Sequence, residues 1–146
     1  MNLYTFLIGD LQISRDLDGD HFFSGVGSFR AHEATNNLCY HEEGVANHPS
    51  GYSSVATRSY YFCIHQNDLG FSVYFDSARS KLFHRIILSS NGMSKNGVDS
   101  HRCSRDLYVS RYRFPVTGDW TWEVFVKGPN KKYSMLSRYQ RKLGNG

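Results

Sequence analysis

The sequence predicts an all-β protein, built as a single antiparallel β-barrel of about 8–10 strands with a short N-terminal helical turn. Turn clusters break the 146-residue chain at short intervals. The runs between them are rich in β-branched and aromatic residues, which pack well on a pleated sheet. No segment shows the sustained 3.6-residue periodicity of a long amphipathic helix. Hairpin-connected strands of this kind are typically closed into a barrel, because closure removes exposed sheet edges.

The expected elements follow one another from turn to turn. The apolar run Leu3–Ile8 is expected to form the helical turn. Strands are expected at residues 9–16, 21–33, 37–44, 54–66, 70–76, 81–89, 101–114, 120–127 and 132–141. The turn clusters between them are Asp18-Gly19-Asp20, Asn36-Asn37, Asn47 to Gly51, Asn67 to Gly70, Asn91 to Ser100, Thr117-Gly118-Asp119 and Gly128-Pro129-Asn130. Alternation of apolar residues is clearest at 70–76 and 120–127.

The strand expected at 101–114 changes parity along its length. His101 and Cys103 share one face, whereas Asp106 falls on the other. A β-bulge near Ser104-Arg105 is therefore expected, because one extra residue would turn both groups inward.

Length and composition fit one globular domain covering residues 1–146. Apolar residues make up 40% of the chain and charged residues 21%, which is ordinary for a soluble protein. Aromatic residues reach 15%. Rings provide contact area at a low cost in entropy, so this content suits both a barrel core and the wall of a ligand pocket.

Charge is unevenly distributed. Residues 1–100 hold seven Lys/Arg and ten Asp/Glu, whereas residues 101–146 hold ten and three. A basic half can attract phosphates, carboxylate ligands or nucleic acid, and it also keeps sheet edges soluble. We favour the second interpretation for most of these charges.

The N-terminus and the cysteines indicate a cytoplasmic, soluble protein. The first twenty residues lack the basic region of a signal peptide, and no run approaches the roughly 20 apolar residues of a membrane helix. Cys39, Cys63 and Cys103 are an odd set without a CxxC pair, which is typical of free thiols in a reducing compartment. The oligomeric state stays open.

Two resemblances sharpen the fold. The segment Phe6 to Leu11, followed by Arg15, resembles the start of the lipocalin and fatty-acid-binding superfamily, the calycins. There a helical turn leads into a Gly-x-Trp strand; Gly9 matches, but Leu11 stands at the Trp position. The resemblance implies that a basic residue of the last strand, Arg138 or Arg141, closes the barrel.

The chain from Gly9 to Arg141 more closely resembles a domain-of-unknown-function family of small calycin-like barrels. The specific elements are His101-x-Cys103-x-x-Asp106-x-Tyr108 and Gly128-Pro129-x-Lys131-x-Tyr133. More generic matches are Gly27-x-Phe29, Tyr40-x-Glu42-x-Gly44, Arg58-x-Tyr60, Phe83-His84 and Trp122-x-Val124. This resemblance implies a barrel with an internal site and implies no particular activity.

Clustered polar and aromatic side chains form the candidate ligand site. They are His84, His101, Cys103, Asp106, Tyr108, Tyr112, Trp122, Lys131, Tyr133 and Arg138. A few polar groups on an aromatic wall are how such pockets orient a ligand. We expect no metal, because Cys103 is a lone thiol and the spacing matches no zinc pattern. A Cys103–His101–Asp106 nucleophilic arrangement is also disfavoured, since no Gly-rich oxyanion turn precedes the thiol. No cofactor is predicted.

Three functions remain open, in this order of preference. The first is a barrel that binds a small apolar or aromatic ligand with one polar end. The second is an enzyme that uses Asp106, Tyr108 or His84 for acid–base chemistry in the same cavity. The third is a nucleic-acid or protein-binding module that uses an exposed stripe of Arg111, Arg113, Lys132 and Arg138.

Overall fold

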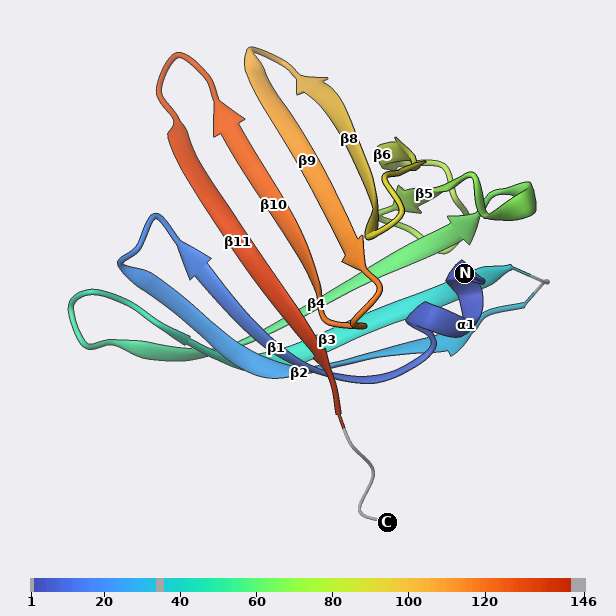
Figure 1. The fold of residues 1–146 in the computed structure, drawn as a ribbon. Helices are drawn as coiled ribbons and strands as arrows, with labels where there is room; N and C mark the ends of the chain where they lie inside the picture. The colour runs from blue at the N-terminus through green and yellow to red at the C-terminus, as the bar shows by residue number, and fades with distance from the viewer. Residues whose placement is uncertain (1, 34–35, 143–146) are drawn as a thin grey trace.

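The strands form one antiparallel sheet that curls into a barrel (Figure 1). The computed structural model describes residues 2–33 and 36–142. Its elements are α1 (Leu3–Leu7), β1 (Gly9–Leu17), β2 (His21–Ala31), β3 (Asn37–Asn47), β4 (Ser53–Ile64), a 3₁₀ turn (Gln66–Asp68), β5 (Gly70–Tyr74), β6 (Leu82–Ile87), β7 (Ser89–Ser90), β8 (Ser94–Cys103), β9 (Asp106–Pro115), β10 (Trp120–Lys127) and β11 (Lys132–Arg141). The sheet order is β6-β5-β4-β3-β2-β1-β11-β10-β9-β8-β7, so β1 and β11 pair near its middle.

The barrel closes where β6 meets β8, and side chains make this seam. The backbone N–H of Arg85 donates to Asp99 Oδ2 at 2.8 Å. Gly97 lies against β6, since a Cβ placed there would lie 2.3 Å from Ile86 Cγ2 and 2.8 Å from the Ile87 carbonyl oxygen. Glycine is therefore required at this point for the two strands to approach each other.

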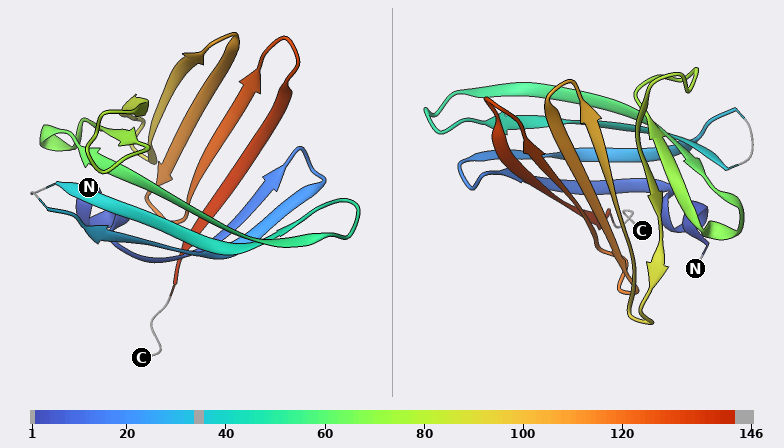
Figure 2. Two further views of the ribbon diagram at one scale, coloured as in Figure 1. Left: turned by 180° about the vertical axis from the view of Figure 1, so that it is seen from behind. Right: turned by 90° about the horizontal axis from the view of Figure 1, so that it is seen from above.

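The two ends of the barrel differ in shape. At one end the hairpins β8–β9 and β10–β11 diverge from β1–β2 and β3–β4 (Figures 1 and 2). At the other end α1 covers the barrel and buries Leu3 and Leu7. Arg141 holds this cover in place by donating to the carbonyl oxygens of Ile8, at 3.1 Å, and Phe6. Of the two basic residues that the calycin resemblance suggested on the last strand, Arg141 is the one that makes this contact.

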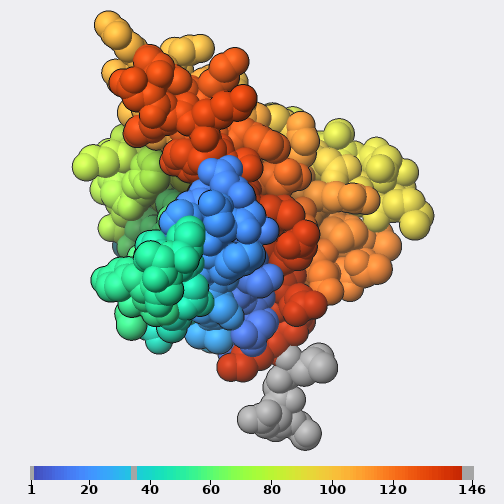
Figure 3. Space-filling model, turned by 90° about the vertical axis from the view of Figure 1, so that its left-hand side faces the viewer, coloured from blue at the N-terminus to red at the C-terminus, as the bar shows by residue number. Residues whose placement is uncertain are grey.

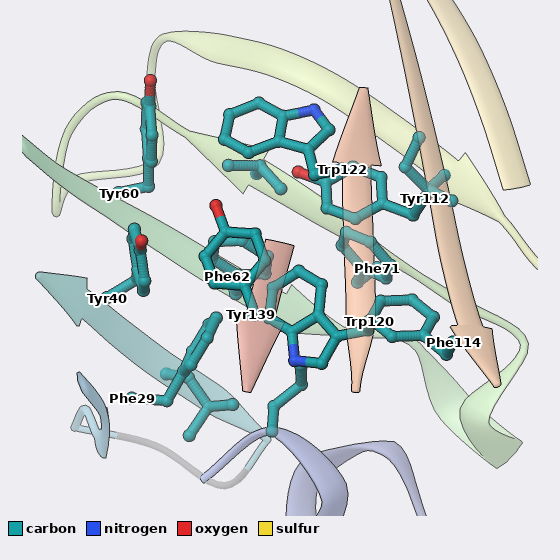
Figure 4. Close-up of a cluster of buried hydrophobic side chains, with 14 of the residues drawn as sticks. Phe29, Tyr40, Tyr60, Phe62, Phe71, Tyr112, Phe114, Trp120, Trp122 and Tyr139 are labelled. Atoms are coloured by element: carbon teal, nitrogen blue, oxygen red, sulfur yellow. The ribbon is translucent and has the colours of Figure 1, made fainter. Parts of the chain in front are cut away.

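Aromatic side chains fill the closed half of the barrel (Figure 4). Trp120 stacks on Tyr139 with ring centroids 3.9 Å apart, and Trp122 stacks on Tyr112 at 5.4 Å. Along β10 the residues alternate between buried and more exposed, as expected for a strand with one face on the core.

Most predicted elements are confirmed, and the main error lies at 101–114. The predicted strands at 120–127 and 132–141 match β10 and β11, and the helical turn matches α1. The predicted single strand with a bulge is wrong: β8 and β9 form a hairpin with a turn at Ser104-Arg105, where Ser104 adopts a left-handed φ of 57°. Residues 94–100, expected in a turn cluster, belong to β8. The Asn96-Gly97 pair in β8 has the composition of a turn. In the structure, however, Gly97 allows β6 and β8 to approach each other closely at the seam.

Candidate functional site

Two pockets lie in the open half of the barrel and share Arg58 and Met135. The first pocket, between β1–β2 and β3–β4, is lined by residues including Arg15, Phe23, Glu42, Ala56, Arg58 and Met135. The second, between β4–β6 and β8–β11, is lined by Arg58, Tyr60, Phe75, Phe83, His101, Cys103, Tyr108, Trp122, Val124, Val126, Tyr133 and Met135. Both are predominantly apolar, with a few polar groups, which is the usual composition of a small-molecule site.

A buried ion pair forms one wall of the first pocket. Arg15 on β1 and Glu42 on β3 make two parallel hydrogen bonds of 2.7 and 2.8 Å, and only 7% and 2% of these residues is exposed. Arg15 Nε also donates to Ser137 Oγ at 2.6 Å, and the Tyr40 hydroxyl donates to Glu42. A buried charge of either sign needs such partners to offset the loss of water.

Both members of this pair stay ionised. Burial acts to lower the pKa of Arg15, but its hydrogen bonds to Glu42 and the negative charge there raise it above its ordinary value. Burial acts to raise the pKa of Glu42, but Arg15 outweighs it and holds that pKa below the usual range. The pair therefore contributes almost no net charge to the pocket.

Arg58 differs from Arg15 in how its charge is met. It lies directly opposite Glu42 on β3, and its charge helps to lower the pKa of that carboxyl, but Glu42 makes its hydrogen bonds to Arg15. None of the ion pairs or side-chain hydrogen bonds found among residues 2–33 and 36–142 involves Arg58. Its guanidinium carbon lies 5.8 Å from the centre of the Tyr60 ring, and the side chain is partly buried. Because Arg58 lines both pockets and Glu42 is already paired with Arg15, these three side chains leave one net positive charge where the pockets meet.

A hydrogen-bonded pair of buried polar side chains lies beneath the second pocket. His84 Nε2 is 2.8 Å from the Tyr112 hydroxyl, and both residues are almost fully buried. Burial lowers the pKa of His84 to about 3, and the nearby His101 adds to this effect, so the imidazole is neutral at pH 7. His84 Nδ1 and Trp122 Nε1 have no partner among the described residues. In Figure 4 the Trp122 nitrogen and the Tyr60 hydroxyl point to the same end of the barrel.

The structure distributes the ten predicted site residues over four places. His101, Cys103, Tyr108, Trp122 and Tyr133 line the second pocket. His84 and Tyr112 lie below it.

The remaining three lie at or outside the rim. Asp106 and Lys131 face each other at 3.3 Å, and this hydrogen bond raises the pKa of Lys131. Arg138 lies exposed on the outer face of β11, away from both pockets, because its position alternates with the inward Ser137 and Tyr139. The three candidate acid–base residues, Asp106, Tyr108 and His84, are consequently not brought to one point.

Sequence reasoning did not select the first pocket or the central arginine. Glu42 and Arg58 lie two positions from buried aromatic residues, in Tyr40-x-Glu42 and Arg58-x-Tyr60, and Arg15 lies two positions from the buried Ile13. A charged residue two positions from a buried side chain on one strand points into the same interior. That spacing is the signal that could have identified them.

The described residues contain no group of three His, Cys, Asp or Glu side chains placed to hold a metal ion. None of the helices in residues 2–33 and 36–142 has the length and hydropathy of a bilayer span.

The fold defines the class of protein, a single antiparallel β-barrel with a short N-terminal helix over one end. The chain belongs to the family of unknown function DUF6314, whose profile matches residues 7–141. No curated protein matches it in sequence.

Two solved structures share the fold at low identity. The S-type phycobiliprotein lyase CPES from Guillardia theta has a TM-score of 0.66 and 8% identity, and the match covers 98% of this chain and 92% of that one. EF1p2_mFAP2b, solved bound to DFHBI, has a TM-score of 0.52 and 9% identity over 95% of this chain and 96% of that one.

Proposed function

We propose that this protein binds a small molecule inside the open half of the barrel. The ligand has an apolar or aromatic body and carries a negatively charged group. The body fits against the rings of Tyr60, Phe83 and Trp122 in the second pocket. The charged group pairs with Arg58. Two barrels of similar fold support the proposal, one described as a phycobiliprotein lyase and the other solved with the small molecule DFHBI.

The lack of a hydrogen-bonding or ion-pair partner for Arg58 among the described residues is the observation that carries the proposal. Its guanidinium is partly buried and gives up hydration, while the carboxylate opposite it, Glu42, accepts its hydrogen bonds from Arg15 and Tyr40. Arg15, in the same barrel, has Glu42 as a partner at 2.7 Å. An anionic ligand would supply Arg58 with the equivalent partner, and charge-assisted hydrogen bonds are about twice as strong as neutral ones.

The acid–base alternative has weaker support. A general acid or base works best with a pKa near the working pH. Burial holds the pKa of His84 at about 3, and Asp106 is paired with Lys131 at the rim. A binding protein uses the observed arrangement without requiring either group to move a proton.

The test compares two fluorescent probes that differ in charge. Anilinonaphthalene sulfonate is anionic, and phenylnaphthylamine has the same rings without the sulfonate. Arg58→Met keeps the aliphatic stem and removes the charge. We expect it to weaken binding of the anionic probe at least about tenfold, because a hydrogen bond to a charged group is worth about 1.5–3 kcal/mol. Binding of the neutral probe should stay within about twofold.

Arg113→Met is the matched control. It removes the same charge from the exposed outer face of β9 and should change neither affinity. If neither probe binds the unmodified protein, the binding proposal fails. Equal loss of both probes in Arg58→Met would mean that the arginine shapes the pocket rather than recognising an anion. Native mass spectrometry of the freshly purified protein would then identify any ligand that remains bound.

A further inference from the structure

Cations gather in one row on the outer face of the barrel, at the open end. Lys127 on β10 pairs directly with Lys132 on β11, and on its other side with Leu107 on β9, which in turn pairs with Arg102 on β8. Arg105 lies in the adjoining β8–β9 turn. We refer to Arg102, Arg105, Lys127 and Lys132 as the basic row. Three of them border a groove between the two hairpin tips, together with Leu107 and Pro129.

The charge of the basic row is not compensated within the described part of the chain. No ion pair found there involves any of its four members. Asp106, the nearest carboxylate in sequence, is paired with Lys131. Like charges directly opposite each other on paired strands destabilise a sheet, so the Lys127–Lys132 pair costs stability in the isolated protein. An anionic surface would offset this cost.

Apolar side chains adjoin the basic row on the same face. Val109 and Phe125 are paired across β9 and β10, one outward position further from the hairpin tips, and Phe125 is 40% exposed. Leu107 lies within the basic row itself. The only carboxylate at the outward positions of β8–β11 is Glu123, which pairs with Arg111 deeper in the sheet. Asp18, in the β1–β2 turn, borders a depression with Phe125, Lys127 and Lys132 and accepts hydrogen bonds from Ser134. The face thus combines exposed apolar groups with four cations and a carboxylate at its edge.

We propose that this face binds the surface of an anionic lipid bilayer. Lysine and arginine are attracted to acidic headgroups, and the neighbouring apolar side chains can enter the headgroup boundary. A binder of single-stranded nucleic acid would present several rings for stacking. Among the outward residues of β8–β11, Phe125 is the one aromatic side chain. Both hairpin tips project from the molecule, so a flat surface can reach them (Figure 3).

The proposed contact does not depend on a ligand in the barrel. It lies on the opposite side of the sheet from Tyr108 and Val126, which line the second pocket. However, the basic row stands beside the mouth of that pocket. Contact with a bilayer would therefore bring the open end close to a medium in which apolar small molecules dissolve.

The experiment measures sedimentation with vesicles of phosphatidylcholine, prepared with and without phosphatidylserine. The unmodified protein should bind the vesicles that contain phosphatidylserine and release them as salt is raised, because surface charges are screened within about 10 Å at 0.1 M salt. Each removed cation should weaken binding roughly fivefold, so the double variant Lys127→Gln/Lys132→Gln should lose roughly 25-fold. Phe125→Ser should weaken binding without changing its dependence on salt.

The control double variant Lys81→Gln/Arg85→Gln removes two exposed cations at and beside β6 and should bind as the unmodified protein does. Arg58→Met should also bind normally, which separates this proposal from the one for the barrel interior. Absence of binding to vesicles with phosphatidylserine would overturn the proposal, as would equal losses in the two double variants. Binding of a single-stranded oligonucleotide in place of vesicles would overturn it and assign the face to nucleic acid.

Discussion

At the scale of single residues, the buried Arg15–Glu42 ion pair is a contact that requires both of its members. Both groups are charged and almost fully buried, and each depends on the other for its partner. Replacing such a pair with apolar residues is often harmless, whereas removing one member leaves an uncompensated charge in the interior. The pair should therefore be sensitive to single substitutions.

Glu42→Gln should destabilise the protein by about 3–5 kcal/mol, because Arg15 would keep its charge without a carboxylate. Urea unfolding followed by tryptophan fluorescence measures the change. Glu43→Gln is the matched control, since Glu43 is the next residue and is exposed. A similar, small effect of both substitutions would contradict a buried ion pair.

His84 should make the protein less stable in acid. Its folded pKa, about 3, lies below its ordinary value of 6.5, so the unfolded chain binds more protons between these two values. Stability from this residue is complete above pH 6.5 and declines as the pH falls toward 3. The slope approaches about 1.4 kcal/mol per pH unit.

Urea titrations at several pH values test this dependence. His84→Gln should flatten the slope while keeping a hydrogen-bonding partner for Tyr112. His41→Gln, at an exposed position, should leave the slope unchanged. An equal slope in unmodified protein and His84→Gln would show that other groups, such as the Glu42 carboxylate with its lowered pKa, dominate acid unfolding.

At the scale of elements, the seam between β6 and β8 depends on one glycine. Gly97→Ala would place a methyl group 2.3 Å from Ile86 Cγ2 and 2.8 Å from the Ile87 carbonyl. Because overpacking costs about 1–3 kcal/mol, the strands should separate and stability should fall by that amount. Hydrogen exchange should accelerate in β6 and β8 before other strands. Ser100→Ala, on the exposed face of β8, should have little effect; an equal loss there would contradict the role of the seam.

The elements were predictable where local signals agreed with the fold. Alternation in β10 and the Gly128-Pro129 turn placed β10 and β11 correctly. Prediction failed at β8 because Asn96-Gly97 has the composition of a turn. The glycine is required for the close contact with β6, which the local sequence does not show. The candidate site was likewise predictable only where local spacing along one strand determines which way a side chain points. His101 and Cys103 follow from parity on one strand, whereas Tyr108 joins them because the β8–β9 hairpin places it opposite His101. The lack of a hydrogen-bond partner for Arg58 within the described residues depends on side chains from several other strands.

At the scale of the whole molecule, the packed aromatic core and the two pockets lie mainly in different halves of the barrel. Leu7 lies under α1 at the closed end, and Met135 lies where the two pockets meet. Leu7→Ala should cost about 2–5 kcal/mol, as buried leucines do, while leaving probe affinity within about twofold. Met135→Trp should fill the junction and abolish binding of both probes, with a change in stability below about 1.5 kcal/mol.

Thermal unfolding and fluorescence titration of the two variants test this separation. A Leu7→Ala protein that stays folded but loses probe binding would show that the closed end shapes the pockets. Retained binding in Met135→Trp would place the probe elsewhere on the molecule.

The seam has a consequence for which ligands the barrel can admit. Ten of its strand junctions are backbone ladders, whereas the junction between β6 and β8 rests on side chains and one bond from Arg85 to Asp99. At one end of this line β6 continues through Leu88 into β7, which pairs with β8, so only the part of the line beyond that short ladder is held by side chains alone. The second pocket borders this line through Phe83 on β6 and His101 on β8. For a ligand in the second pocket, as we propose, this line is where the wall could widen with the loss of the fewest backbone hydrogen bonds.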